Sequence, residues 1–279
     1  MSGCRSNAKP FRIPGLTTLV AAAVLSGCAS APPKVPYPAF IQADELADVY
    51  IAGLPGVSAK QFAADPQTRR TSNRILLPAQ WQFGTGAAPD KSVEIFVLAG
   101  EIHLADISLG PGGYAYLPAG SLGMSMRTTQ GAELLYFLDQ PDPDAVIQTP
   151  LIMSSGSMPW KAMSDNPGDF GLSVRELRAD PGSGARTWLL KIDPAARQEW
   201  HKRPAVLEGY LVQGNYQHSE CVDGQVATWR YSKGGYFQRP PGVLNGGPEA
   251  KSDGTSIWLL RTLTSGEVSA ADYCAAAAN

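Results

Sequence analysis

Residues 112–123 read GGYAYLPAGSLG and residues 234–245 read GGYFQRPPGVLN, so one glycine- and proline-rich corner occurs twice in this chain. Two other stretches repeat in the same order: GVSAKQFAADP at 56–66 with GLSVRELRADP at 171–181, and VEIFVLAGEI at 93–102 with LEGYLVQGNY at 207–216. Three repeated blocks in one order indicate two copies of one domain. The offset grows from 114 residues in the middle block to 122 in the last, which places an insertion in the second copy between Gly214 and Gly234.

Both copies have the local pattern of antiparallel β-structure. The stretch SVRELRADPGSGARTWLLKI at 173–192 predicts two strands around a DPGSG turn, and the 29 glycines and 23 prolines suit many tight turns. Helical periodicity is found mainly in ADELADVYIAG at 43–53. The sequence therefore predicts an all-β fold with one short N-terminal helix before the first copy.

The repeated corner also resembles a known family. The spacings Gly112-x5-Pro118-x-Gly120 and Gly234-x5-Pro240-x-Gly242 resemble the second motif of the cupin superfamily, and VEIFVLAGE and LEGYLVQGN resemble the end of its first motif. The resemblance covers both copies and implies a bicupin, that is, two double-stranded β-helix (jelly-roll) barrels in tandem. More narrowly, the chain resembles bacterial cupins of uncharacterised function and the metal-binding cupin of an anti-sigma factor.

The N-terminus has the pattern of an export signal. Arg5, Lys9 and Arg12 precede the apolar run LTTLVAAAVLSGC at 16–28, which is too short for a permanent membrane span. The tetrad Leu25 to Cys28 resembles the lipobox of bacterial lipoproteins, which implies lipidation at Cys28. Ala29 follows the cysteine in place of Asp, and resemblance to enterobacterial sorting signals then implies the periplasmic face of the outer membrane. We therefore expect a signal peptide at 1–27, a lipidated N-terminus and tether at 28–42, cupin 1 at 43–140, a linker at 141–164, cupin 2 at 165–265 and a tail at 266–279.

The charge balance narrows the choice of partners. Without residues 1–27 the chain has 20 Lys and Arg against 25 Asp and Glu, which does not favour a nucleic-acid partner. The expected partners are the membrane, through the lipid anchor, and a small-molecule ligand; a homodimer is left open. Of the four cysteines, Cys4 lies in the signal peptide and Cys28 is the expected lipid site, so Cys221 and Cys274 are the two left in a chain that is expected in an oxidising compartment. The sequence leaves open whether they form a disulfide or stay as two thiols.

The cupin resemblance implies where a metal would bind. Metal-using cupins carry His-x-His-x4-Glu in the first motif and a histidine three residues after the Pro-x-Gly glycine in the second. The second copy matches with His201 and Glu208, but it has Arg203 and Asn245 at the other two positions. The first copy keeps only a glutamate, and its four positions are Ala87, Pro89, Glu94 and Gly123.

Two cofactor states are therefore expected: none, or one divalent transition metal (Fe, Mn, Ni or Zn) held by His201, Glu208 and His218. The alternative for His218 is an edge-strand or surface histidine with no role in the site.

The remaining residues of the second copy describe a binding site without a metal. Arg203 can pair with Glu208 or bind an anion, and Asn245 offers both a donor and an acceptor. We expect a small polar or anionic ligand in the second barrel, bound by Arg203, Glu208, Asn245, Tyr210 and Trp200.

Whether the protein is an enzyme stays open. The alternative to a binding protein is a metal-dependent cupin enzyme of the oxygenase, isomerase or lyase type that uses His201 and Glu208. A third reading is an envelope scaffold with both barrels filled by side chains. No catalytic residue is assigned.

Overall fold

The computed structural model describes residues 40–51, 53–121, 123–163, 168–271 and 273–274. The predicted signal peptide, Cys28 and nearly all of the tether lie outside these residues. Within the described ranges, no helix has the length and hydropathy needed to cross a membrane.

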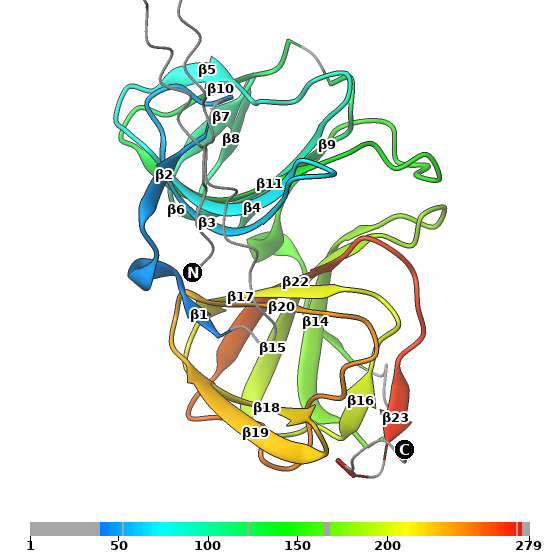
Figure 1. The fold of residues 1–279 in the computed structure, drawn as a ribbon. Coiled ribbons are helices and arrows are strands. Elements are labelled where there is room, and N and C mark those ends of the chain that lie inside the picture. The colour runs from blue at the N-terminus through cyan, green and yellow to red at the C-terminus, as the bar shows by residue number, and fades with distance from the viewer. Residues whose placement is uncertain (1–39, 52, 122, 164–167, 272, 275–279) are drawn as a thin grey trace, which may run out of the picture. The chain divides into compact units, whose positions relative to one another are not determined.

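The first barrel is built from a seven-stranded and a four-stranded antiparallel sheet, in the orders β12-β9-β6-β11-β4-β3-β2 and β5-β10-β7-β8 (Figure 1, blue to green). Its strands are β2 (Asp48–Tyr50), β3 (Ser58–Asp65), β4 (Arg70–Leu77), β5 (Gln82–Gly84), β6 (Ser92–Gly100), β7 (Ile102–Leu104), β8 (Ile107–Leu109), β9 (Gly113–Leu117), β10 (Ser125–Arg127), β11 (Ala132–Asp139) and β12 (Leu151–Ser154).

The second barrel has a seven-stranded sheet in the order β1-β20-β17-β22-β15-β14-β13, a three-stranded sheet β19-β18-β21 and the pair β16-β23. Its strands are β1 (Ile41–Gln42), β13 (Lys161–Ala162), β14 (Phe170–Ala179), β15 (Arg186–Arg197), β16 (Trp200–Lys202), β17 (Leu207–Gln213), β18 (Tyr216–Val222), β19 (Gln225–Tyr231), β20 (Gly235–Arg239), β21 (Lys251–Ser252), β22 (Ser256–Thr262) and β23 (Ser269–Ala271).

The two barrels share one topology, which confirms the all-β tandem jelly-roll fold. The order β9-β6-β11-β4-β3 in the first barrel corresponds to β20-β17-β22-β15-β14 in the second. The hairpin β7–β8 has three residues in each strand, whereas its counterpart β18–β19 has seven in each. The longer hairpin lies between Gly214 and Gly234, where the repeat offsets place the insertion.

The segment that precedes each copy pairs with the other barrel. Strand β1 lies before the first copy and pairs with β20 of the second barrel, while β12 lies before the second copy and pairs with β9 of the first. A short 3-10 turn follows each arm, η1 (Ala43–Glu45) and η2 (Ser155–Ser157), and the N–H of its first residue donates to Gly234 O or Gly112 O. The barrels are therefore linked by a reciprocal exchange of arms.

The predicted N-terminal helix at 43–53 is wrong. This segment holds the 3-10 turn η1 and then strand β2, which pairs with β3 so that Asp48 lies opposite Lys60. The Lys60 ammonium lies 3.1 Å from the Asp48 carboxylate and also donates to the Leu46 carbonyl. An isolated helix of this length is marginal in water, so pairing along a sheet edge overrides the local periodicity.

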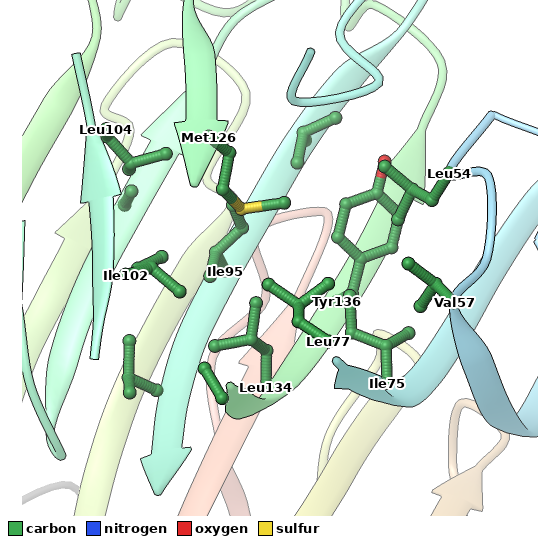
Figure 2. Close-up of a cluster of buried hydrophobic side chains, with 14 of the residues drawn as sticks. Leu54, Val57, Ile75, Leu77, Ile95, Ile102, Leu104, Met126, Leu134 and Tyr136 are labelled. Carbon is green, nitrogen blue, oxygen red and sulfur yellow. The ribbon is translucent and has the colours of Figure 1, made fainter. Parts of the chain in front are cut away.

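The interior of the first barrel is filled by apolar side chains. Figure 2 shows Ile102, Leu104 and Met126 packed with residues of β4, β6 and β11, and all of them are buried. The one polar atom that Figure 2 places in this cluster, the Tyr136 hydroxyl, donates to the Thr85 carbonyl.

A charged layer connects the two barrels. Glu94 accepts from Tyr114 of its own barrel and Thr187 of the other. Glu208 accepts in the same way from Tyr236 of its own barrel and Ser72 of the other. We call Glu94 and Glu208 the glutamate pair. The two glutamates thus occupy equivalent places about an approximate two-fold axis.

One guanidinium serves both members of the glutamate pair. Arg261 is 2% exposed; its Nη1 donates to Glu208 at 3.0 Å, and its Nη2 donates to Glu94 at 3.0 Å and to Asp139 at 2.5 Å. These buried carboxylates raise the pKa of Arg261 well above its ordinary value, although burial alone acts to lower it. The same guanidinium stacks on Phe137, 4.2 Å from the ring centroid.

Candidate functional site

The second barrel contains a pocket with a cavity volume of about 50 Å³. A water molecule needs roughly 10–15 Å³ of such space, so this volume suits a small molecule of a few non-hydrogen atoms. Apolar side chains from Leu172, Leu190, Leu207, Phe237 and Trp258 make up much of the lining. The polar lining residues are Asp169, Gln198, His201, Arg203, Tyr216, His218, Arg239 and Asn245.

The polar side of the pocket is formed by β16, the corner 243–247 and β18, which lie side by side. Asn245 pairs with His201 through two backbone hydrogen bonds of 2.9 and 3.0 Å. On its other flank the corner bonds to β18, because Cys221 N donates to Leu244 O and Gly246 N donates to Ser219 O. We call these three segments the polar wall. Residues 243–247, which begin inside the second repeated corner and extend two residues past it, thus join the two histidine-bearing strands.

The corner needs glycine at Gly246. Its φ is +96°, and a Cβ there would lie 2.7 Å from the Glu199 carbonyl oxygen and 3.2 Å from His201 Nδ1. A side chain at this position would push β16 away from the corner.

Asn245 lines the pocket, and part of its side-chain amide is already bonded within the fold. Its Nδ2 donates to the carbonyls of His201 and Val243, each at 3.2 Å. A ligand therefore meets Asn245 mainly as a hydrogen-bond acceptor, through Oδ1.

Glu208 does not lie in this pocket, which corrects the predicted ligand set. Successive side chains of a strand point to opposite faces, and on β17 it is Leu207 that faces the cavity. Glu208 faces the first barrel, where it accepts from Ser72, Tyr236 and Arg261. Its ionic partner is therefore Arg261, in place of the predicted Arg203.

Tyr210 and Trp200 also lie outside the lining of the pocket. Tyr210 shares the face of Glu208 and packs on Phe62 of the first barrel at a ring distance of 5.6 Å. Trp200 is buried against the corner, where a Cβ on Gly247 would lie 2.3 Å from its ring. Both aromatic residues thus support the fold around the site without lining it.

His218 does line the pocket, so the edge-strand alternative is excluded by its position. It is 6% exposed, and its ring stacks on Phe237 with an interplanar angle of 8°. Arg239, which the sequence analysis did not single out, lies beside it: Nη2 donates to His218 Nε2 at 2.6 Å, and Nε donates to Glu220 at 2.8 Å. The sequence does carry a sign of Arg239: at the same place in the repeat the first barrel has the apolar Leu117, and the second has the charged Arg239.

Hydrogen bonds assign the roles of the ring nitrogens. A guanidinium only donates, so His218 Nε2 accepts from Arg239 and the neutral ring carries its proton on Nδ1. A carbonyl only accepts, so His201 Nδ1 donates to Glu199 O at 3.1 Å and Nε2 holds the lone pair. Beyond these bonds, Nδ1–H of His218 is a hydrogen-bond donor and Nε2 of His201 is a hydrogen-bond acceptor.

Both pocket histidines are neutral near pH 7. Burial lowers the pKa of His201 to about 4, and the nearby Arg203 acts in the same direction. Burial also lowers the pKa of His218 to about 4, assisted by Arg239. Arg239 together with hydrogen bonding lowers the pKa of Glu220 to about 2, against the effect of its burial. The charges at the pocket are therefore those of Arg203, Arg239, Asp169 and Glu220.

These shifts predict that the protein loses stability as the pH falls from about 6.5 to about 4. In that window the unfolded chain binds protons at His201 and His218 that the folded chain does not, so the free energy of unfolding decreases with decreasing pH. For His218 the full difference is on the order of 3 kcal/mol. Glu220, whose pKa of about 2 lies below its ordinary value of 4.5, adds a further loss of stability that begins near pH 5 and continues below pH 4.

Urea unfolding between pH 7 and pH 4 measures this effect, with His218→Gln as the matched variant. The variant should show a shallower dependence of stability on pH. An identical slope in both proteins would contradict the assignment of His218.

The described residues do not fit a cupin metal centre. No group of three His, Cys, Asp or Glu side chains in the described ranges is arranged to hold a metal ion. The lone pair of His218 Nε2 already accepts from Arg239, and the position of the second histidine holds Arg203, whose guanidinium supplies no electron pair to a cation. The carboxylate of Glu208 is present in the sequence but faces the first barrel, where it accepts from Ser72, Tyr236 and Arg261.

The two barrels and their motifs define a tandem protein of the cupin fold. Comparison with solved structures agrees: a Nostoc punctiforme protein described as a "putative dioxygenase" is 20% identical with a TM-score of 0.65, over 83% of this chain and 86% of that one. An oxalate decarboxylase of Lactobacillus farciminis in complex with formate is 10% identical with a TM-score of 0.60, over 86% and 89%. The oxalate decarboxylase of Bacillus subtilis, a protein with Mn(II) centres, is 12% identical with a TM-score of 0.54, over 83% and 78%.

At these identities the likeness concerns the fold. The particular family is given by the sequence: residues 54–269 match the family described as Domain of unknown function (DUF4437), and the chain belongs to it. No curated protein sequence matches the chain.

Proposed function

We propose that this protein is an envelope lipoprotein whose second barrel binds a small polar molecule that carries a carboxylate. The observation that carries the proposal is the lining of the pocket, which joins two arginines and one aspartate to apolar walls. Arginine recognises carboxylates through paired N–H donors. The bonds to Glu220 and His218 use Nε and Nη2 of Arg239, and Nη1 carries two further N–H groups.

The ligand should also carry a hydrogen-bond donor. Asn245 Oδ1 and His201 Nε2 are hydrogen-bond acceptors, because the amide nitrogen of Asn245 and Nδ1 of His201 are the donors in these side chains, so a ligand that carries an O–H or N–H group can donate to them. A hydroxyl group beside the carboxylate satisfies both requirements. With about 50 Å³ available, the class is that of short hydroxy acids.

Binding of formate, acetate, glycolate and oxalate to the purified protein tests the proposal by isothermal titration calorimetry. We expect glycolate to bind more tightly than acetate, because only glycolate supplies the hydroxyl donor. Arg203→Met should weaken binding at least about tenfold, a loss of about 1.4 kcal/mol. Arg230 on β19 is exposed and lies outside the lining, so Arg230→Met is the matched control and should bind like the parent.

Absence of binding by all four acids, or equal affinity in Arg203→Met, would overturn the proposal. The lipid anchor is a separate part of it and rests on the sequence around Cys28. Fractionation of cells that express the Cys28→Ser chain tests the anchor, since the protein should then leave the membrane fraction.

No observation at this site favours the alternative function, a metal-dependent enzyme. Its candidate ligands His201 and Glu208 lie on different faces of the second barrel's wall, as described above.

A further inference from the structure

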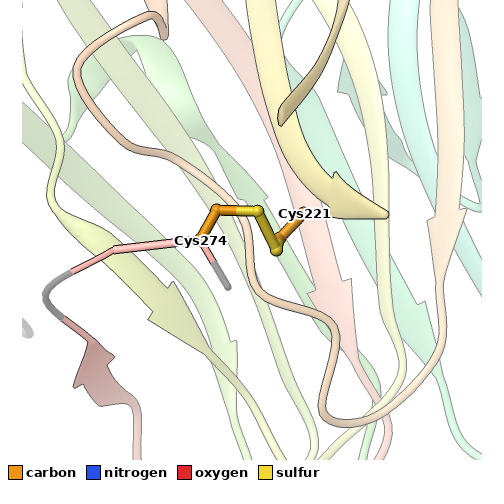
Figure 3. Close-up of a disulfide and its surroundings, with 2 residues drawn as sticks. All are labelled: Cys221 and Cys274. Carbon is orange, nitrogen blue, oxygen red and sulfur yellow. A yellow bond between two sulfur atoms is a disulfide. The ribbon is translucent and has the colours of Figure 1, made fainter. Parts of the chain in front are cut away.

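The C-terminal segment is joined to the polar wall at both of its edges. Strand β23 pairs with β16, so that Ala270 lies opposite His201 and Ala271 opposite Trp200. Three residues beyond β23, Cys274 forms a disulfide with Cys221 at the end of β18, as Figure 3 shows. We call β23 and Cys274 the clasp.

The clasp encloses the histidine-bearing part of the pocket. The order across the wall is β18, the corner 243–247, β16 and β23, and the disulfide returns from β23 to β18. Cys221 lies three residues from His218 and directly follows Glu220, the partner of Arg239. A cross-link between the outer elements therefore limits how far β16 and β18 can separate.

A second contact holds the other end of β16. The segment before β23 lies against Pro204, and a Cβ on its Gly266 would lie 2.2 Å from the Pro204 side chain. Pro204 directly follows Arg203, which lines the pocket. The C-terminal segment thus contacts the chain on both sides of the His201–Arg203 stretch.

We infer that the clasp is a positioning device for the pocket, and that reduction of the Cys221–Cys274 disulfide weakens ligand binding in the second barrel. A dithiol breaks the S–S bond: two electrons and two protons pass to the two cysteine sulfurs, and the dithiol becomes a disulfide. Both cysteines are only half-buried, so a small reductant can reach them. This inference rests on the proposed function for its binding readout.

The test combines ligand affinity with a signal that needs no ligand. The chain has three histidines, His103, His201 and His218, so NMR spectra of histidine-labelled protein are simple. Reduction with dithiothreitol should shift or broaden the signals of His201 and His218 and leave that of His103, in the first barrel, unchanged. The dissociation constant for the carboxylate that binds best should rise at least about tenfold.

Two variants separate the clasp from a general loss of folding. Cys221→Ser/Cys274→Ser should match the reduced protein and no longer respond to dithiothreitol. Both backbone groups of His201 bond to Asn245, so the bonds between β16 and β23 lie at the neighbouring pair of Trp200 and Ala271. Ala271→Pro removes the N–H of that pair while keeping both cysteines, and it should also weaken binding in the oxidised protein. If the double variant does not fold, the reduced parent and Ala271→Pro decide the question.

The outcomes distinguish the two proposals. If no carboxylate binds the oxidised protein, the proposed function fails, and the histidine signals alone test the clasp. If the reduced protein stays folded with affinity within twofold and unchanged signals of His201 and His218, the clasp has no positioning role.

Discussion

Replacing Arg261 with methionine is expected to lower the free energy of unfolding by at least about 3–5 kcal/mol, the usual cost of breaking a buried ion pair from one side. Arg261 donates to Glu208, Glu94 and Asp139, and all of these groups are buried. Methionine keeps much of the volume but leaves three carboxylates without their common cation. Urea unfolding measures the loss, and two separate transitions would show that the barrels have come apart.

Two comparisons make this result specific. Arg69 and Asp90 form an ion pair of 3.1 Å whose side chains are 68% and 60% exposed, so Arg69→Met should cost less than about 1 kcal/mol. In the Arg261→Met background, Glu94→Gln and Glu208→Gln together should recover part of the loss, because amides tolerate burial without a cation. A loss below about 1 kcal/mol, or no recovery, would contradict the role of Arg261.

The second large effect is expected at Trp188, a fully buried side chain at the centre of the second barrel's core. Trp188→Ala should cost about 3–5 kcal/mol, because the cavity left behind adds to the lost burial. Trp188 Nε1 has no hydrogen-bond partner among the described residues. Trp188→Phe should therefore cost clearly less, since it removes an unpaired donor along with part of the volume.

The control for Trp188 is an aromatic side chain on the surface. Phe170 is 65% exposed, so Phe170→Ala should change the free energy of unfolding by no more than about 0.5 kcal/mol. The same urea midpoints serve all three variants. Equal losses in Trp188→Ala and Trp188→Phe would show that the indole N–H is paired in solution.

The fold was predictable because its evidence is distributed along the chain. The paired blocks at 93–102 and 207–216 both became strands, and the two corners at 112–123 and 234–245 took equivalent places. The helix at 43–53 failed for the opposite reason: its evidence was local, and the pairing of β2 with β3 is a contact that a local pattern does not contain.

The site was predictable only in part because it depends on strand register. His201, Arg203 and Asn245 all line the pocket, and their positions follow from the corner and from β16. Glu208 was expected in the pocket, but the residue of β17 that lines it is the preceding one, Leu207. A shift of one residue along a strand moves a side chain to the other face. His218 and Arg239 come from β18 and β20, so only the folded barrel brings them to the same cavity.

The stacking of Arg261 on Phe137 has a consequence for how this chain is put together. Phe137 lies opposite Glu94 in the ladder of β6 and β11, and Arg261 lies opposite Glu208 in the ladder of β17 and β22, so the two residues hold equivalent places in the duplicated halves. Two identical halves would bring either two guanidiniums or two phenyl rings together at the axis. The first choice crowds like charges, and the second removes the guanidinium that the two glutamates share. Because both halves lie in one chain and can differ in sequence, one half supplies the ring and the other the charge, and the two halves are no longer interchangeable.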